Sequence, residues 1–220
     1  MIPTILYTGS STVEFKQYQK SSRINFEHYP ILRFEKLEEP KSMDLRGVQY
    51  CIVSSQKTVE FLAEKSKEYQ SKDFYVVGRK TAKALAKYNI RAKKIALEGF
   101  ASLEEWIPTE KMGIFLGAKE LAQPAQSFLN NTVNCRHIAV YRSFLTKERP
   151  KEKEYCAVII TSPKAIKGIE ALALPKDILV FAIGDSSETA ALECGFLNVQ
   201  KSKEATIESL FSTVTSYYSA

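Results

Sequence analysis

The sequence has 220 residues, of which 45% are hydrophobic and 25% charged, and its formal net charge is +6. This composition is typical of a folded globular chain and excludes a disordered or low-complexity protein. Apolar runs such as residues 178–183 are far shorter than the ~20 residues of a membrane-spanning helix. The dispersed lysines lack the interleaved aromatic residues of a nucleic-acid surface. We therefore expect no membrane segment and no nucleic-acid partner, but a positive field that attracts a small polyanion.

The N-terminus has the apolar pattern of a strand over residues 1–7. It lacks the basic region and the small-residue cleavage site of a signal peptide. We therefore predict a first strand, followed by a helix before residue 25, and we expect a cytoplasmic location.

Further along the chain, two pairs of segments resemble each other in order and spacing. Residues 51–59 form an apolar strand, two hydroxyl residues, a basic residue and the start of a helix, and residues 158–166 repeat this pattern. Residues 76–85 and 182–191 form a second pair, each with a glycine between strand and helix. The separation is nearly the same in both pairs, which predicts two copies of one supersecondary unit.

A third pair, residues 101–106 and 205–210, has the capping pattern that opens a helix. Within each copy, apolar strands alternate with helical patterns. For the first copy we predict strand 48–53, helix 57–69, strand 74–77 and helix 81–88. Such alternation indicates a parallel sheet covered on both faces. The predicted fold class is α/β, with two similar doubly wound, flavodoxin-like lobes.

The segments outside the repeat complete these lobes. Residues 1–25 supply a strand and a helix before the first copy, and residues 111–131 supply the same elements between the copies. Two extended stretches, 29–34 and 138–144, can pair as a two-strand connector that absorbs lobe movement. We therefore assign residues 1–31 and 146–220 to lobe 1, residues 38–137 to lobe 2, and residues 32–37 and 138–145 to the linker.

Several kinds of catalytic and cofactor site are not predicted. The sequence has neither a nucleotide-binding glycine loop nor a G-x-S-x-G elbow. Its four cysteines are scattered without a C-x-x-C pair, and its two histidines are isolated. We expect no metal and no cofactor.

Hydroxyl and glycine residues recur where an apolar strand passes into a helix. The carboxyl ends of strands line the ligand crevice of open α/β sheets, and helix N-termini offer N–H donors to carboxylates. Serine and threonine at such places are also ordinary helix N-caps. Four such loops in two matched lobes favour a large cleft for an anion. The candidate binding residues are Ser54, Ser55, Gly78, Thr81, Ser162, Gly184, Ser186 and Ser187.

Three further residues each have two interpretations. Lys57 and Lys164 follow the strand-end hydroxyl pairs, and each either counters ligand carboxylates or is a solvated residue of a first helical turn. Tyr141 lies in the proposed connector. It either donates a proton into the cleft or is a strand aromatic of the common kind.

Four motifs together resemble the uroporphyrinogen-III synthases in order and spacing, over nearly the whole chain. They are Val76-Val77-Gly78 with Thr81-Ala82, Val140-Tyr141-Arg142-Ser143, Ile160-Thr161-Ser162-Pro163-Lys164, and Phe181-Ala182-Ile183-Gly184. The resemblance implies two α/β lobes joined by a two-strand linker, and an enzyme without a cofactor.

The resemblance also implies the substrate and the reaction. The substrate is hydroxymethylbilane, a linear tetrapyrrole whose rings each carry an acetate and a propionate. Loss of its hydroxyl as water leaves an azafulvene, which ring D attacks to give a spirocyclic intermediate. Reclosure with ring D inverted yields uroporphyrinogen III. We expect a monomer that makes at most transient contact with the upstream bilane synthase.

By position, Tyr141 matches the family tyrosine proposed to assist hydroxyl departure as a general acid. Ser55, Thr81, Ser162, Ser186 and Ser187 match hydroxyl or amide positions that hold carboxylates, and Gly78 and Gly184 match tight turns. Asp185 departs from the family pattern and would repel a carboxylate, so we expect it to cap its helix.

Other readings remain open. The same cleft would serve a non-catalytic bilobal protein that binds a small polycarboxylate anion, or a divergent relative of the synthases. A flavin-binding or receiver-type α/β module is a further alternative.

Overall fold

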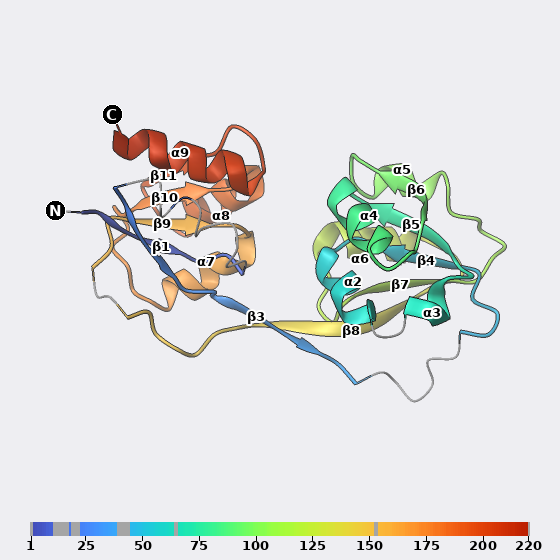
Figure 1. The fold of residues 1–220 in the computed structure, drawn as a ribbon. Coiled ribbons are helices and arrows are strands. Elements are labelled where there is room, and N and C mark those ends of the chain that lie inside the picture. The colour runs from blue at the N-terminus through green and yellow to red at the C-terminus, as the bar shows by residue number, and fades with distance from the viewer. Residues whose placement is uncertain are drawn as a thin grey trace. The chain divides into compact units, whose positions relative to one another are not determined.

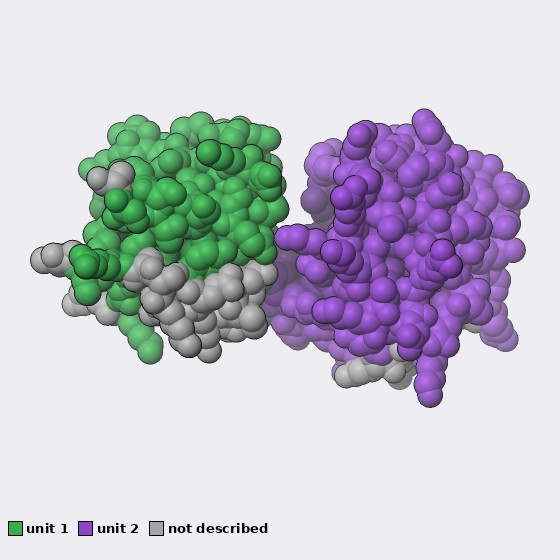
Figure 2. All heavy atoms as spheres, turned by 45° about the horizontal axis from the view of Figure 1, so that its top comes forward, with its two compact units in different colours: residues 1–33, 144–220 green, residues 34–143 purple. Residues whose placement is uncertain are grey.

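The computed structural model describes residues 2–10, 18, 23–38, 45–63, 66–151 and 154–219. The chain divides into two compact units, coloured separately in Figure 2. Unit 1 comprises residues 1–33 and 144–220, and unit 2 comprises residues 34–143. The chain passes from unit 1 to unit 2 within strand β3 (Leu32–Lys36) and returns within β8 (Cys135–Leu145).

Unit 2 contains a mostly parallel sheet, sheet 2, in the order β3-β8-β7-β4-β5-β6 (Figure 1). Its other elements are β4 (Tyr50–Val53), α2 (Gln56–Leu62), α3 (Ser66–Tyr69), β5 (Asp73–Val77), α4 (Arg79–Ala86), β6 (Ala92–Ala96), α5 (Ala101–Glu104), β7 (Gly113–Ala118) and α6 (Gln123–Asn131). The pairs from β4 to β8 are parallel. β3 runs antiparallel to β8, because Leu37 N–H bonds Val140 O at 3.0 Å while Thr146 N–H bonds Ile31 O at 2.9 Å.

Unit 1 contains a parallel sheet, sheet 1, in the order β11-β10-β9-β1-β2. Its elements are β1 (Thr4–Tyr7), β2 (Asn25–His28), β9 (Ala157–Ile160), α7 (Pro163–Glu170), β10 (Leu179–Ala182), α8 (Asp185–Glu193), β11 (Asn198–Lys201) and α9 (Ile207–Ser219). The helix that the sequence predicts before residue 25 lies, except for Tyr18, outside the described residues.

The two sheets have the same spatial order of strands but start at different points of the chain. β4, β5 and β6 correspond to β9, β10 and β11, while β7 and β8 correspond to β1 and β2. Along the chain of unit 2, β7 and β8 come after β4, β5 and β6. In unit 1 the corresponding strands, β1 and β2, come before β9, β10 and β11. Unit 1 therefore has the flavodoxin-like order 2-1-3-4-5, and unit 2 is its circular permutation. The predicted α/β class with two parallel sheets is confirmed.

Both faces of each sheet are buried, which explains the continuous apolar strands. In unit 2, Cys51 and Val53 pack with α2 and α4 on one face, while Tyr50 and Ile52 pack with α5 and α6 on the other. Alternate residues of a strand point to opposite faces, so a strand covered on both sides has no polar position. In unit 1, α7 and α8 cover one face and α9 the other.

Two predicted elements differ from the structure. Instead of one helix over residues 57–69, α2 ends at Leu62 and α3 begins at Ser66. β8 begins at Cys135, ahead of the predicted stretch 138–144, because its first half pairs in parallel with β7. β8 is thus a strand of sheet 2 as well as a link between the units. In the described part of the chain, no helix combines the length and the hydropathy needed to cross a membrane.

Candidate functional site

The predicted residues of unit 2 gather at the carboxyl-end edge of sheet 2. Ser54 and Ser55 follow β4, and Gly78 follows β5. Tyr141 stands in register with Ala118, the last residue of β7. Because these strands are parallel neighbours, their ends meet at one edge, and the Tyr141 hydroxyl lies 3.5 Å from Ser55 Oγ.

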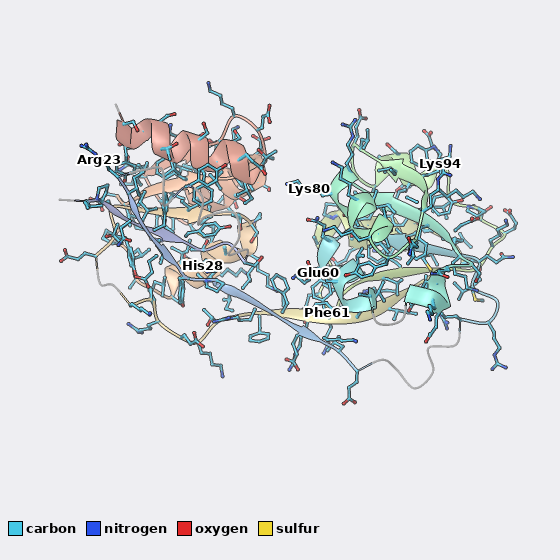
Figure 3. All side chains as sticks on the ribbon, in the orientation of Figure 1. Arg23, His28, Glu60, Phe61, Lys80 and Lys94 are labelled. Atoms are coloured by element: carbon cyan, nitrogen blue, oxygen red, sulfur yellow. The ribbon has the colours of Figure 1, made fainter. Side chains whose placement is uncertain are left out.

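Tyr141 is held in an aromatic cluster. Only 7% of its surface is exposed, and its ring lies 5.9 Å from Phe34 and 5.4 Å from Phe61 between centroids. Figure 3 shows Phe61 on α2, close to β8. This packing holds the ring, and the contact of its hydroxyl to Ser55 Oγ is long.

Ser55 and Lys57 each have a local structural partner. Ser55 is the N-cap of α2, and its Oγ accepts a hydrogen bond from Lys57 N–H at 3.1 Å. Lys57 forms an ion pair with Glu60 in the next turn, and its Nζ lies 5.3 Å from the centre of the Phe34 ring. Ser55 therefore caps its helix, and any role in ligand binding would be additional.

Gly78 and Thr81 lie at the start of α4. Gly78 has φ +86, in the left-handed region that glycine tolerates, and its N–H bonds Ala96 O at 2.9 Å. Arg79 and Lys80 follow in the exposed first turn, where Figure 3 labels Lys80. The N-terminus of α4 therefore combines the positive end of a helix dipole with two cationic side chains.

The predicted residues of unit 1 lie at the carboxyl-end edge of sheet 1. Ser162 is the N-cap of α7, yet its Oγ is buried and has no hydrogen-bond partner among the described residues. Ser187, in the first turn of α8, is 1% exposed, and its Oγ also has no partner in the part of the chain that the structure describes. Lys164 and Ser186 are exposed first-turn residues of α7 and α8.

Two expectations about the start of α8 are wrong. Asp185 does not cap the helix, because Gly184 is the N-cap and Asp185 is already helical. The Asp185 carboxylate instead forms an ion pair with Lys201 at the end of β11. The hydrogen bond and charge of Lys201 lower the pKa of Asp185. Gly184 has φ 179, an extended conformation that any residue adopts, so it is not a counterpart of the Gly78 turn.

Sequence reasoning missed a loop of this edge, residues 8–10 after β1. Thr8 is 2% exposed and its Oγ1 donates to Ile159 O at 2.7 Å, so the loop is tied to β9. At Gly9 an added Cβ would lie 2.3 Å from the Tyr7 hydroxyl, so a larger residue would force the tyrosine to move. The signal was available: an apolar strand followed by Thr8-Gly9-Ser10 has the pattern of the other strand ends.

Two histidines that the sequence left unassigned occupy equivalent positions in the two sheets. His28 stands in register with Tyr7, and His137 with Phe115. Tyr7 and Phe115 are equivalent, because β9 and β4 are equivalent strands and each residue pairs with the third residue of its strand, Ile159 in β9 and Ile52 in β4. His28 Nε2 donates to Gly9 O at 2.7 Å, which fixes the loop after β1. Burial lowers the pKa of His137.

Three buried hydroxyls that lack hydrogen-bond partners among the described residues lie at these helix starts. Besides Ser162 and Ser187, Thr58 in the first turn of α2 is 0% exposed, and its Oγ1 has no partner in the described ranges. Buried polar groups in native proteins are normally hydrogen-bonded, so exceptions call for an explanation. Rotation of a serine about χ1 would bring such a hydroxyl to an anion at the helix N-terminus.

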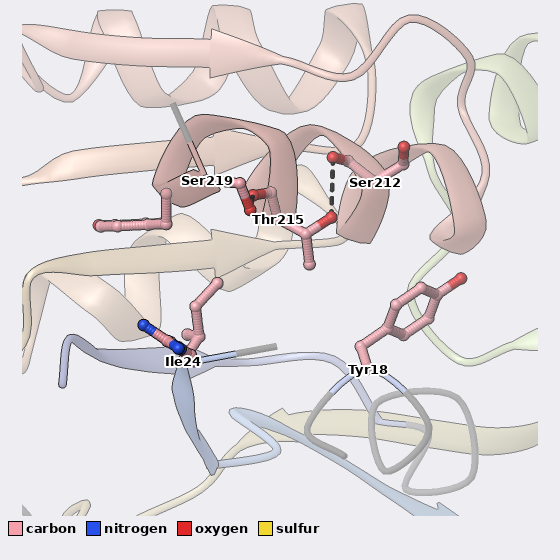
Figure 4. Close-up of a pocket in the computed structure, with 7 residues that line it drawn as sticks. Tyr18, Ile24, Ser212, Thr215 and Ser219 are labelled. Carbon is pink, nitrogen blue, oxygen red and sulfur yellow. Dashed lines mark hydrogen bonds between the residues drawn. The ribbon is translucent and has the colours of Figure 1, made fainter. Parts of the chain in front are cut away.

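A large pocket lies elsewhere. It has a volume of about 640 Å³ and is lined by Arg23, Ile24 and the second half of α9 (Figure 4). Ile24 precedes β2, so this pocket is at the amino-end edge of sheet 1. The hydroxyl of Thr215 in its wall is engaged with Phe211 O at 3.0 Å, within its own helix. The chemistry of the strand ends is therefore a better guide to the site than pocket volume.

Among the described residues, no three or more His, Cys, Asp or Glu side chains form a group that could hold a metal ion. What the two edges offer chemically is hydroxyl groups, helix N-termini, cationic side chains and one tyrosine. These groups suit binding of carboxylates and a single proton transfer.

Comparisons with known proteins bear on the fold and the family of the chain. The chain is similar in structure to the uroporphyrinogen-III synthetase of Helicobacter pylori, with 19% identity, a TM-score of 0.74, and coverage of 98% of this chain and 99% of that one. It is also similar to a mutant uroporphyrinogen III synthase of Thermus thermophilus, with 17% identity, a TM-score of 0.66, and coverage of 99% and 98%. At these identities the likeness shows the fold.

A comparison with curated protein sequences gives no match. The sequence profile described as "Uroporphyrinogen-III synthase HemD" matches residues 14–212, which is most of the chain. The chain belongs to the uroporphyrinogen-III synthase family.

Proposed function

We propose that this protein performs the reaction of its family, the cyclisation of hydroxymethylbilane to uroporphyrinogen III and water with inversion of ring D. The enzyme is then a lyase of haem and tetrapyrrole biosynthesis. The family match over residues 14–212 is the observation that carries this proposal.

The chemistry of the two carboxyl-end edges supports the same function. The substrate has eight carboxylates and no phosphate, so it needs many moderate anion contacts rather than one phosphate loop. Helix N-termini with hydroxyl residues provide such contacts. Ser54, Ser55, Gly78 and Thr81 in unit 2, and Ser162, Gly184, Ser186 and Ser187 in unit 1, are the proposed binding residues. Lys57 and Lys164 are proposed to add positive charge.

Tyr141 is the proposed general acid for departure of the hydroxyl as water. Its phenol is buried among aromatic rings, where it has one long contact, 3.5 Å to Ser55 Oγ. In this environment the ring is fixed while the O–H is able to rotate toward a leaving hydroxyl. The protein's larger task is to hold the bilane so that ring D attacks through its substituted carbon, because proximity and orientation decide which closure occurs.

Location and partners belong to the same proposal. We propose a monomeric cytoplasmic enzyme that works without a cofactor and takes its short-lived substrate from the upstream bilane synthase, with at most transient contact. Net charge supports steering of the substrate, since a chain of formal charge +6 attracts a polycarboxylate at low ionic strength.

The test is an assay of product isomers. Hydroxymethylbilane is generated in the reaction mixture, the products are oxidised, and uroporphyrins I and III are separated by chromatography. We expect isomer III to predominate with protein and isomer I without it. Isomer I alone, in the presence of folded protein, would reject the synthase function and leave the reading of a polycarboxylate-binding protein.

A further inference from the structure

The first turns of the two equivalent helices α4 and α8 carry opposite charges. In unit 2, α4 starts with Arg79 and Lys80, whereas the first turn of α8 in unit 1 carries Asp185 and Glu188. Acidic residues at this place stabilise a helix through its dipole. They also repel any carboxylate that binds the same N-terminus. A ligand carboxylate therefore meets this repulsion at α8 in unit 1 but not at α4 in unit 2.

Lys201 lies against both acidic groups. It is the last residue of β11 and stands in register with Ala182, the last residue of β10. Its ammonium forms an ion pair with Asp185 and lies 3.1 Å from Glu188 Oε2. Hydrogen bonds to these two carboxylates raise the pKa of Lys201. The equivalent position of β6 is Ile95, which pairs with Val76 as Lys201 pairs with Ala182, so this cation is specific to unit 1.

The start of α8 also holds a polar group without a partner. Ser187 is 1% exposed, and its Oγ has no hydrogen-bond partner among the described residues. The Cα–Cβ bond of a helical residue tilts toward the helix N-terminus, so the Ser187 side chain leans toward the start of α8. Backbone bonds anchor the preceding loop: Ile183 N–H bonds Ile160 O at 3.1 Å, and Ser202 Oγ bonds Ile183 O at 2.9 Å.

We propose that Lys201 is a positioning residue for substrate binding, which offsets one of the two negative charges of Asp185 and Glu188 so that the N-terminus of α8, with Ser187, accepts a substrate carboxylate. This inference rests on the proposed function. The lysine acts by offsetting charge and does not itself touch the reacting atoms.

The role is separable from fold stability. Asp185 has an 88% exposed side chain and Lys201 a 38% exposed one, and exposed ion pairs contribute little to folding. The binding of a substrate carboxylate, by contrast, depends directly on the net charge at the start of α8. In wild-type protein the three side chains sum to one negative charge, and loss of Lys201 leaves two.

The test is a charge cycle on KM, measured by initial rates of isomer III formation at low ionic strength. Lys201→Gln is expected to raise KM about fivefold, as one unscreened charge near the surface implies, and to leave kcat unchanged. Asp185→Asn combined with Lys201→Gln restores the wild-type charge sum, so KM is expected to return to within about twofold of wild type. Added salt should shrink the fivefold difference.

Lys176→Gln is the matched control. It removes another lysine of unit 1 that lies near a glutamate, 3.8 Å from Glu170 Oε1, but ahead of β10 at the opposite edge of the sheet. Its KM is expected to stay at the wild-type value. An unchanged KM in Lys201→Gln, or a double variant as poor as Lys201→Gln, would overturn the inference. Failure of wild-type protein to form isomer III would instead reject the proposed function itself.

Discussion

The two units share one arrangement of strands but differ at the edge where ligands of this fold bind. Unit 2 has a buried tyrosine in an aromatic cluster and a helix that begins with two cations. Both units have buried hydroxyls without partners in the described residues, but in unit 1 the start of α8 carries acidic residues that Lys201 partly offsets. The repeated strand order therefore determines which loops lie together at the carboxyl-end edge of each sheet. The individual side chains determine the chemical properties of each edge. In our account unit 2 supplies the proton and strong positive charge, and unit 1 supplies hydrogen-bonding positions.

Substitution of Tyr141 should have the largest effect. Tyr141→Phe keeps the ring packed against Phe34 and Phe61 but removes the proton donor. We expect kcat for isomer III to fall about 100-fold, the lower range for loss of a general acid, with little change in the free energy of unfolding. Steady-state kinetics and urea denaturation measure the two quantities.

Tyr75→Phe is the matched control for this change. Tyr75 is a buried tyrosine of the same sheet, and it belongs to the core on the opposite face. The control should retain wild-type kcat. If Tyr141→Phe and Tyr75→Phe are equally active, Tyr141 is not the proton donor, and our claim that unit 2 supplies the proton is wrong.

The cations of α4 should come next. Replacing Arg79 and Lys80 together with glutamine removes the positive charge that distinguishes α4 from α8. We expect KM to rise about tenfold at low salt and its dependence on ionic strength to weaken. Lys83 and Lys87, at the other end of α4, give the control pair. If both double variants raise KM equally, general charge and not the helix start is responsible.

Ser55 and Ser162 give a smaller contrast, because they occupy the same N-cap position in α2 and α7. Ser55 Oγ accepts from Lys57 N–H, so Ser55→Ala should lower the free energy of unfolding by about 1 kcal/mol. Ser162 Oγ has no partner among the described residues. Ser162→Ala should therefore be neutral or slightly stabilising, because it removes a buried unsatisfied group. Denaturation midpoints that shift equally would contradict this assignment.

The sequence allowed much of the fold to be predicted, because the repeat and the continuous apolar strands are local patterns. It also allowed most of the strand-end residues to be located, since hydroxyls after an apolar strand are visible in the chain. The circular permutation explains why segments outside the repeat, residues 1–25 and 111–131, looked alike.

Other features depend on contacts between distant residues. The pairing of Asp185 with Lys201 follows from the neighbouring positions of β10 and β11, which no local pattern reveals. The sequence pattern alone therefore predicts a helix cap at this first-turn aspartate. The equivalence of His28 and His137 likewise required the strand register. Whether a hydroxyl such as Ser162 Oγ is satisfied depends on packing and was not predictable.

The smallest effect concerns pH and His137. Burial lowers the pKa of His137 below the ordinary value of 6.5. Below that value the unfolded chain binds a proton that the folded chain refuses, so stability falls as pH drops through this range. Between pH 7.5 and 5.5, we expect the free energy of unfolding of His137→Phe to change less with pH than that of wild type, as measured by urea denaturation. If the free energy of unfolding of His137→Phe depends on pH as strongly as that of wild type, groups other than His137 control the loss of stability at low pH.

The most direct test of the account is to map where a tetrapyrrole polycarboxylate binds, by following backbone amide NMR signals during titration with uroporphyrin III. We predict shifts at both carboxyl-end edges, at Ser55 and Gly78 in unit 2 and at Gly9, Gly184 and Ser187 in unit 1. Ile24 and Thr215, beside the 640 Å³ pocket at the amino-end edge, should stay unchanged. Shifts confined to that pocket, or to one unit alone, would contradict the claim that both edges bind the substrate.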